Sequence, residues 1–110
     1  MVAPLIVLPE KSKNVPLSNK THLNANIGEN VTAVTETTLS INCPISGTPT
    51  PEVTWLKDGQ KINVSRDVNI YENFTLTLQR ATVSDSGRYK CVIENIAGKD
   101  SMTSDITVIG

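Results

Sequence analysis

Two cysteines carry most of the chemistry that this chain could perform, as metal ligands, reactive thiols or a disulfide. Cys43 and Cys91 are the only cysteines, and they lie too far apart in the sequence to form a local Cys-x-x-Cys zinc pair. The single histidine, His22, adds few further ligands for a soft metal. No metal site is therefore predicted, and the two sulfur atoms are expected either to form a bridge or to remain a pair of free core thiols.

No catalytic set accompanies the cysteines. His22 stands in a polar stretch, without a cysteine or serine placed to use it as a base. Glu94, Asp100 and Asp105 lack the spacing of a calcium-binding loop, and no glycine-rich phosphate loop occurs. The sequence therefore predicts no enzyme activity, no cofactor and no small-molecule substrate.

The elements that must position the cysteines are predicted to be β-strands. Apolar residues recur at alternate positions within 39–43, 53–55, 74–78, 89–93 and 102–108, so each segment has a buried and a solvated face. No stretch of ten or more residues repeats its apolar residues with the period of a helix. Short strands separated by turns favour a sandwich of two sheets.

Glycine and proline mark the ends of the predicted strands. Asp58-Gly59 supplies the positive φ that a tight hairpin requires, and Asn95–Gly98 is the last turn. The segment 46–51 contains one glycine and two prolines, which do not sit in a central ladder. It is therefore expected to end the strand that holds Cys43.

The N-terminal quarter of the chain is predicted to differ from the rest. Residues 1–28 are expected to form an extended arm, a linker or an edge strand, and residues 29–110 the folded domain. Prolines interrupt the first part, so Leu5 to Leu8 is the candidate edge strand and residues 14–26 are expected to form a loop or arm. Val31 to Val34 is the first regular strand.

The cysteines stand in a fixed relation to two aromatic residues. Trp55, the only tryptophan, follows Cys43 by twelve positions, and Tyr89 precedes Cys91 by two. This order is typical of a β-sandwich in which the tryptophan packs against a bridge between the sheets. Because sandwich sheets pack about 10 Å apart, inward-facing cysteines on two strands can meet, which favours a disulfide over free thiols.

The segment before the second cysteine predicts a tyrosine corner. Asp85, Gly87 and Tyr89 precede Cys91 at intervals of two. Tyr89 is expected to bury its ring and to bond its hydroxyl to a backbone group near Asp85, while Gly87 permits the close approach. Arg66 is a candidate salt-bridge partner for Asp85. These residues are interpreted as structural and not catalytic.

Several motifs together resemble an immunoglobulin domain of the I-set, over residues 29–109. They are Cys43 with Trp55, Leu76-Thr77-Leu78, Asp85-Ser86-Gly87-Arg88-Tyr89-Lys90-Cys91 and the turn Asn95-Ile96-Ala97-Gly98. Two further segments are similar to immunoglobulin modules of secreted ADAMTS-like and papilin-type matrix proteins. These are Ile27-Gly28-Glu29-Asn30-Val31-Thr32 and Cys43-Pro44-Ile45-Ser46-Gly47-Thr48-Pro49.

The resemblance implies both a fold and a class of function. The fold is all-β, an immunoglobulin-like β-sandwich of the I-set type with one inter-sheet disulfide. The function is non-catalytic: protein–protein interaction or spacing in a multidomain protein of the extracellular matrix or cell surface. The alternative is a structural I-set domain of an intracellular sarcomeric filament protein, which predicts reduced cysteines and unglycosylated asparagines.

The asparagines bear on the cellular compartment. Four Asn-x-Ser/Thr acceptors for N-glycosylation occur, a modest excess over chance in a chain rich in Asn, Ser and Thr: Asn19, Asn30, Asn63 and Asn73. This excess supports passage through the secretory pathway. The predicted location is extracellular, either secreted or as the ectodomain of a larger protein.

The charge pattern favours protein partners over nucleic acid. Ten Lys and Arg residues stand against eleven Asp and Glu, for a net charge of −1, and no basic stripe occurs. Lys11, Lys13 and Lys20, together with His22, form a mildly basic group. This group could contact a glycosaminoglycan or anionic lipid, or it could be a solvated tail.

Two surfaces are candidates for contact with another protein. One is the solvated face of the strand that holds Cys91, with Arg88, Lys90 and Glu94. The other is the loop Thr48–Pro51. No apolar run approaches the roughly 20 residues needed to cross a bilayer.

Overall fold

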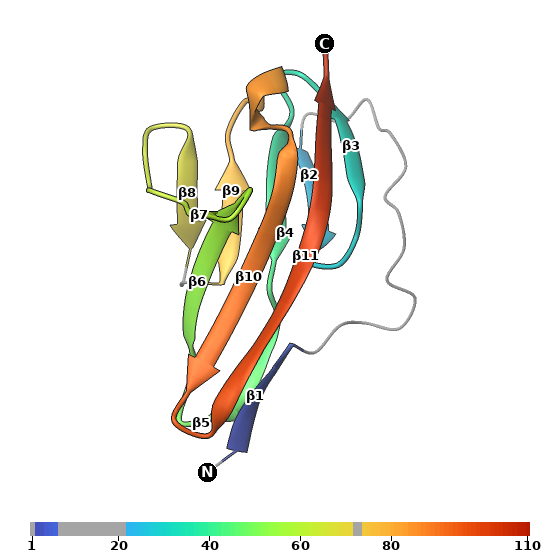
Figure 1. Ribbon diagram of the computed structural model, residues 1–110. Helices are drawn as coiled ribbons and strands as arrows, with labels where there is room; N and C mark the ends of the chain where they lie inside the picture. The colour runs from blue at the N-terminus through green and yellow to red at the C-terminus, as the bar shows by residue number, and fades with distance from the viewer. Residues whose placement is uncertain (1, 7–21, 72–73) are drawn as a thin grey trace.

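Two β-sheets face each other across an apolar core (Figure 1). The computed structural model describes residues 2–6, 22–71 and 74–110. The strands are β1 (Val2–Ile6), β2 (His22–Asn26), β3 (Val31–Val34), β4 (Thr38–Asn42), β5 (Ile45–Thr48), β6 (Glu52–Lys57), β7 (Gln60–Lys61), β8 (Val68–Tyr71), β9 (Thr75–Leu78), β10 (Gly87–Asn95) and β11 (Gly98–Ile109). A short 3-10 turn, η1 (Val83–Asp85), is the single helical element of this part of the chain.

The strands are arranged as the two layers of a sandwich. One sheet has five strands in the order β3-β11-β10-β6-β7, and the other has four in the order β2-β4-β9-β8. β1 and β5 form a separate antiparallel pair at the end of the molecule where the N terminus lies (Figure 1). Two neighbouring pairs are parallel, β3 with β11 and β2 with β4. The predicted all-β sandwich is confirmed.

The core consists of the inward-facing residues of both sheets. In β10, Tyr89, Cys91 and Ile93 are buried, while Arg88 and Glu94 are exposed, as the alternation predicts. Aliphatic side chains fill most of the remaining space, because they suit a pleated surface. The other buried apolar residues are Ile6, Ala25, Ile27, Val31, Ala33, Leu39, Ile41, Cys43, Trp55, Leu76, Leu78, Ala81, Ile106 and Val108.

The predicted hairpin between β6 and β7 is present. Asp58 and Gly59 both have positive φ, 50° and 86°. A two-residue loop with both central residues in this region matches the right-handed twist of the strands it joins. The last turn also forms as predicted, since β10 ends at Asn95 and β11 begins at Gly98.

Residues 14–26 were predicted to be a loop or arm, and the loop alternative is wrong in the described part of this segment. His22–Asn26 is strand β2, which lies parallel to β4 with His22 opposite Thr38. The segment is polar, but it pairs with the backbone of β4 and buries Ala25 on the core side. The rest of the predicted loop lies outside the described residues, and the division of the chain at residue 28 stays a prediction.

A sharp change of direction follows β2. Gly28 has a φ of 99°, a left-handed conformation that costs glycine little. Its backbone N–H donates to Ser104 Oγ at 2.8 Å, on β11 of the opposite sheet. The chain thus passes from the four-stranded sheet to the five-stranded sheet, where β3 begins at Val31.

The first strand and the segment after Cys43 form a pair that alternation does not reveal. β1 is an edge strand, as one prediction for the arm proposed; Val7 and Leu8 of the candidate Leu5 to Leu8 lie outside the described residues. Its partner β5 covers Ile45–Thr48, a stretch in which residues 46–48 were expected to be an irregular strand end. The glycine is tolerated because this ladder has only two strands and no central position.

Candidate functional site

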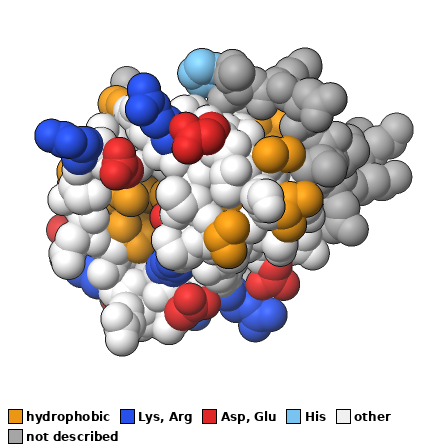
Figure 2. Space-filling view, turned by 90° about the horizontal axis from the view of Figure 1, so that it is seen from above, with side chains coloured by type: hydrophobic (Ala, Val, Ile, Leu, Met, Phe, Trp, Pro, Cys, Tyr) orange, Lys and Arg blue, Asp and Glu red, His pale blue; other side chains and the backbone are white. Residues whose placement is uncertain are grey.

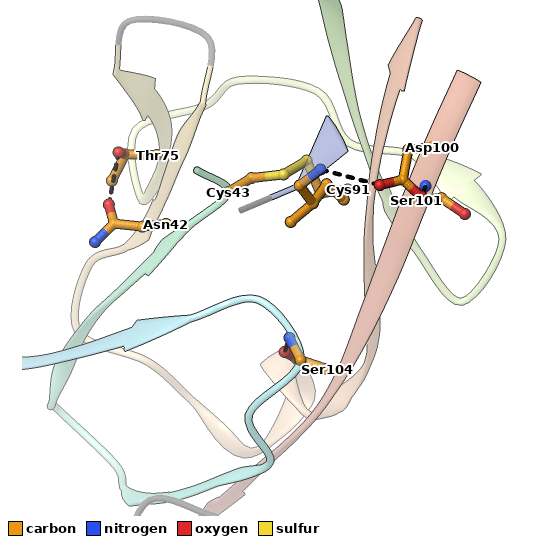
Figure 3. The surroundings of a disulfide bond; sticks show 9 residues. Asn42, Cys43, Thr75, Cys91, Asp100, Ser101 and Ser104 are labelled. Carbon is orange, nitrogen blue, oxygen red and sulfur yellow. Dashed lines mark hydrogen bonds between the residues drawn. A yellow bond between two sulfur atoms is a disulfide. The ribbon is translucent and has the colours of Figure 1, made fainter. Parts of the chain in front are cut away.

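A disulfide joins the two sheets at the centre of the core (Figure 3). Cys43 directly follows β4, Cys91 lies on β10, and their Cα atoms are 6.4 Å apart. Both residues are fully buried, and no free cysteine exists. The predicted disulfide is therefore confirmed, and the alternative of two free thiols is not. These sulfur atoms are consequently not available as nucleophiles or metal ligands.

Trp55 packs beside the disulfide. It lies opposite Cys91 in the pairing of β6 with β10, and its side chain is buried in the same apolar cluster as both cysteines. Its indole Nε1–H is buried without a hydrogen-bond partner among the described residues. Trp55 therefore contributes apolar packing and not polar contacts.

The tyrosine corner has the predicted geometry. The buried Tyr89 donates its hydroxyl hydrogen to the carbonyl oxygen of Asp85, with an O···O distance of 2.5 Å. Asp85 ends the 3-10 turn η1, and its carboxylate accepts from the backbone N–H of Thr82 at 2.8 Å. The hydroxyl thus ties the loop before β10 to the body of the sheet.

Gly87 leaves room for a neighbouring carboxylate. A Cβ atom at Gly87 would lie 2.8 Å from Asp58 Oδ2, which is closer than real Cβ contacts. The other oxygen of Asp58 accepts from the backbone N–H of Arg88 at 2.9 Å. The group that lies close to Gly87 is therefore the Asp58 carboxylate of the β6–β7 hairpin. The sequence pattern did not indicate this contact.

The predicted salt bridge between Arg66 and Asp85 does not form. Asp85 uses its carboxylate within its own turn, on the N–H of Thr82. Within the described ranges the single ion pair joins Arg88 Nε to Asp105 Oδ1 at 2.9 Å. The partner of Asp85 is therefore local in sequence: its carboxylate, three residues after Thr82, accepts the free backbone N–H at the start of the turn.

Replacing Tyr89 by phenylalanine is expected to lower the free energy of unfolding by about 1–3 kcal/mol, because the buried carbonyl of Asp85 loses its donor. Urea denaturation of both proteins measures this difference. Tyr71→Phe is the matched control, since Tyr71 is 49% exposed, and it should change stability by less than about 0.5 kcal/mol. Equal midpoints for Tyr89→Phe and the unchanged protein would rule out a stabilising role for the bond.

Tyr89 should also make the fold less stable in alkaline solution. Burial raises the pKa of its hydroxyl, and the Asp85 and Asp58 carboxylates raise it further. Above the ordinary tyrosine pKa of about 10 the unfolded chain loses this proton and the folded chain keeps it. Stability therefore falls as the pH rises past that value. Urea denaturation at about pH 8 and about pH 10.5 measures the loss of stability between the two pH values. The unchanged protein should lose more stability than Tyr89→Phe does, and equal losses would contradict this coupling.

Two polar residues on the inner face of β11 were not predicted to have a role. Asp100 lies opposite Ile93, and its Oδ2 accepts from the backbone N–H of Ile6 at 2.9 Å, which holds β1 against the sandwich (Figure 3). Ser104 lies opposite Tyr89 and bonds Gly28. The signal was present in the sequence, because polar residues occupy inward positions of an otherwise alternating strand.

The candidate contact face lies on the outer side of the five-stranded sheet. Arg88 and Glu94 are exposed, and Lys90 and Val92 are half-buried along β10. The hydrogen bond and charge of Asp105 raise the pKa of Arg88, so this guanidinium stays charged and partnered. Lys90 and Glu94 make no ion pair within the described ranges. They are therefore the charges of β10 most open to a partner.

The candidate loop Thr48–Pro51 is held by the last turn. Asn95 donates from its side-chain amide to the carbonyl oxygens of Val2, at 2.8 Å, and Pro49, at 3.0 Å. The loop borders an open hollow of about 390 Å³ whose lining includes Glu52 and Glu94. The loop and the outer face of β10 are thus one continuous surface.

Two of the four glycosylation acceptors lie in the described part of the chain, and both are exposed. Asn63 follows β7, and Asn30 precedes β3. The Oδ1 atom of Asn30 accepts from the N–H of Asp105 at 3.1 Å, which leaves its amide nitrogen unused by that bond. Asn19, Asn73 and the basic residues Lys11, Lys13 and Lys20 lie outside the described residues, so their roles stay predictions.

Figure 2 shows the end of the sandwich where the C terminus lies. Basic and acidic side chains are interspersed there with apolar ones, without a broad area of one sign. In residues 2–6, 22–71 and 74–110 no three metal-ligating side chains gather, and no helix could span a membrane.

Comparison with known proteins places this geometry in a family. The family model for the immunoglobulin I-set domain matches residues 22–108. Mouse hemicentin-1 is 36% identical over 87 residues, which are 78% of this chain. Human ADAMTS-like protein 3 is 35% identical over 102 residues, 93% of this chain. The chain spans only 2% of that hemicentin and 6% of that ADAMTS-like protein.

The fold has a close counterpart among solved structures. Titin domain M7 superposes with a TM-score of 0.75 and 23% identity, and the match covers 100% of this chain and 98% of that one. This likeness concerns the fold alone. With the family model, the inter-sheet disulfide and the tyrosine corner, it leads to one assignment. The chain belongs to the immunoglobulin I-set family.

Proposed function

We propose that this domain is an interaction or spacer module of an extracellular matrix or cell-surface protein. The disulfide between Cys43 and Cys91 is the observation that carries the proposal. Disulfides persist in oxidising compartments and are rare in the cytosol, where thiols are kept reduced. The bridge is fully buried between two sheets, which suits a structural and not a catalytic sulfur pair.

Two further observations support the extracellular location. Asn30 and Asn63 are exposed acceptors at the ends of strands, where a bulky glycan can be accommodated. The motifs around Ile27 and Cys43 resemble modules of secreted ADAMTS-like proteins, and ADAMTS-like protein 3 matches most of the chain. Immunoglobulin-like domains are generally non-catalytic, which agrees with a role in contact or spacing.

The proposed partner class is protein. The outer face of the five-stranded sheet offers half-buried apolar residues between charges that lack ion-pair partners in the described ranges. Interfaces of this mixed kind bind by complementarity of shape and charge. A structural domain of an intracellular filament protein is the alternative, and it requires reduced cysteines and unmodified asparagines.

Intact mass of the chain secreted from mammalian cells separates these two functions. The extracellular proposal expects a mass that gains two hydrogens on reduction and falls when N-glycans are removed enzymatically. Asn30→Gln and Asn63→Gln should each remove one glycan if that site is used, and Thr32→Ala and Ser65→Ala are matched variants that keep the asparagine. A secreted chain with free thiols and no glycan would overturn the proposal.

A further inference from the structure

The outer face of the five-stranded sheet carries a basic row across its strands. Lys90 of β10 lies opposite Leu56 of β6, and Leu56 lies opposite Lys61 of β7. On the other side, Lys90 lies opposite Thr103 of β11. Cross-strand partners point to the same face of a sheet, so this row presents two lysines beside one half-buried leucine.

A row of opposite sign lies further along the same strands. Glu94 of β10 lies opposite Glu52 of β6 and Lys99 of β11. Both glutamates are exposed, and neither forms an ion pair within the described residues. Lys99 offsets one of the two carboxylates, so the row keeps an excess of negative charge.

An uncharged row separates the basic and acidic rows. Val92 lies opposite Thr54 of β6 and Ser101 of β11. Lys90 and Glu94 stand two residues to either side of Val92, so they are about 13 Å apart along the strand. Along β10 the face therefore carries a positive charge on one side of Val92 and a negative charge on the other.

From this arrangement we infer that two copies of the chain associate through this face, as an isologous dimer. A two-fold axis that runs across the strands at Val92 lays Val92 on its counterpart and places Lys90 of each copy over Glu94 of the other. Glu52 lies beside Glu94, so each Lys90 faces one carboxylate directly and has a second carboxylate one strand away. An isologous contact of this kind uses the same patch twice and closes at two subunits.

The distribution of the other charges on the face agrees with a second copy as the occupant. Arg88 is held by Asp105 in the same chain, and it stands at the end of β10 that is remote from Val92. Lys61 stands at the edge of the basic row, one strand beyond Leu56, and so flanks the acidic row of the second copy. Because the two-fold axis repeats each contact, the attraction between Lys90 and Glu94 occurs twice in the dimer and favours this pairing of the two copies.

The inference rests on the proposed role as an interaction module, and it names the partner. Its test is sedimentation velocity of the oxidised chain over a range of concentrations, at about 0.05 M and about 0.5 M salt. The unchanged chain should form a dimer that weakens in high salt. Lys90→Glu and Glu94→Lys should each raise the dissociation constant about tenfold or more, since both symmetric contacts become repulsive.

An equimolar mixture of the two variants is the decisive arm. One copy then carries carboxylates at positions 90 and 94 and the other carries two ammonium groups, so both direct contacts between positions 90 and 94 become attractive. The heterodimer should therefore form more tightly than either variant does with itself, although Glu52 is unchanged and lies beside position 94. Arg66→Glu is the control, because Arg66 is exposed in the loop before β8 of the other sheet. Melting temperatures confirm that each variant is folded.

Three results would overturn the inference: a monomer at every concentration, a dimer indifferent to both substitutions, or a mixture that associates no more tightly than either variant alone. None of these would affect the proposed extracellular location, which intact mass tests separately. A monomeric chain with a bridge and glycans would leave a different protein as the partner of this face.

Discussion

Replacing Cys43 and Cys91 together by alanine is expected to lower the free energy of unfolding by about 4 kcal/mol. The bridge closes a loop of sequence separation 48, and in the chain-entropy view its loss frees the unfolded state by that amount. A domain of this size is stable by about 5–15 kcal/mol in total. The melting temperature should therefore fall by about 15–30 °C, as measured by circular dichroism.

The reductant provides the control for this experiment. Reduction breaks the same bond and keeps both sulfur atoms, so the reduced wild type should lose most of the stability that the double variant loses. The double variant itself should not respond to the reductant. If verified reduction left the melting temperature of the wild type unchanged, the bridge would not be a source of stability.

The inner architecture was predictable because it depends on local patterns. Strands such as Thr38–Asn42 and Gly87–Asn95 bury alternate residues whichever sheet they join. The spacing of Cys43, Trp55 and Tyr89 then indicates how these strands are ordered. The hairpin at Asp58-Gly59 follows from the positive φ that both positions adopt. In each case the physical cause lies within a few residues of the element.

The elements that the sequence did not reveal owe their structure to distant backbone. His22–Asn26 is polar and becomes a strand because the edge of β4 offers unpaired backbone groups. Ile45–Thr48 adopts an extended conformation because β1, which is distant in the sequence, pairs with it. Neither contact leaves a periodic signal, since the partner and not the side chains decides the conformation.

The candidate site divides in the same way. The tyrosine corner is local; a bond from the Tyr89 hydroxyl to a backbone group near Asp85 was predicted, and the acceptor is the carbonyl oxygen of Asp85 itself. The pair Arg66 and Asp85 was wrong because a nearer donor, the N–H of Thr82, takes the carboxylate. The basic and acidic rows on the outer face could not be predicted, because they depend on the pairing register of β6, β10 and β11.

Replacing Trp55 by alanine is expected to lower the free energy of unfolding by about 3–5 kcal/mol. Trp55 is 2% exposed and lies opposite Cys91, so alanine would leave a cavity against the disulfide that the two sheets cannot close. Urea denaturation followed by circular dichroism measures the change, since the only tryptophan is lost with the substitution.

Trp55→Phe separates packing from polarity at the same position. Phenylalanine keeps most of the aromatic volume and removes Nε1–H, which is buried without a partner in the described part of the chain. A buried donor that lacks an acceptor is itself unfavourable. The loss for phenylalanine should therefore be less than half of the loss for alanine. If the two losses were equal, the indole N–H and not the ring volume would hold Trp55 in place, and a hydrogen bond to this group would have to exist in solution.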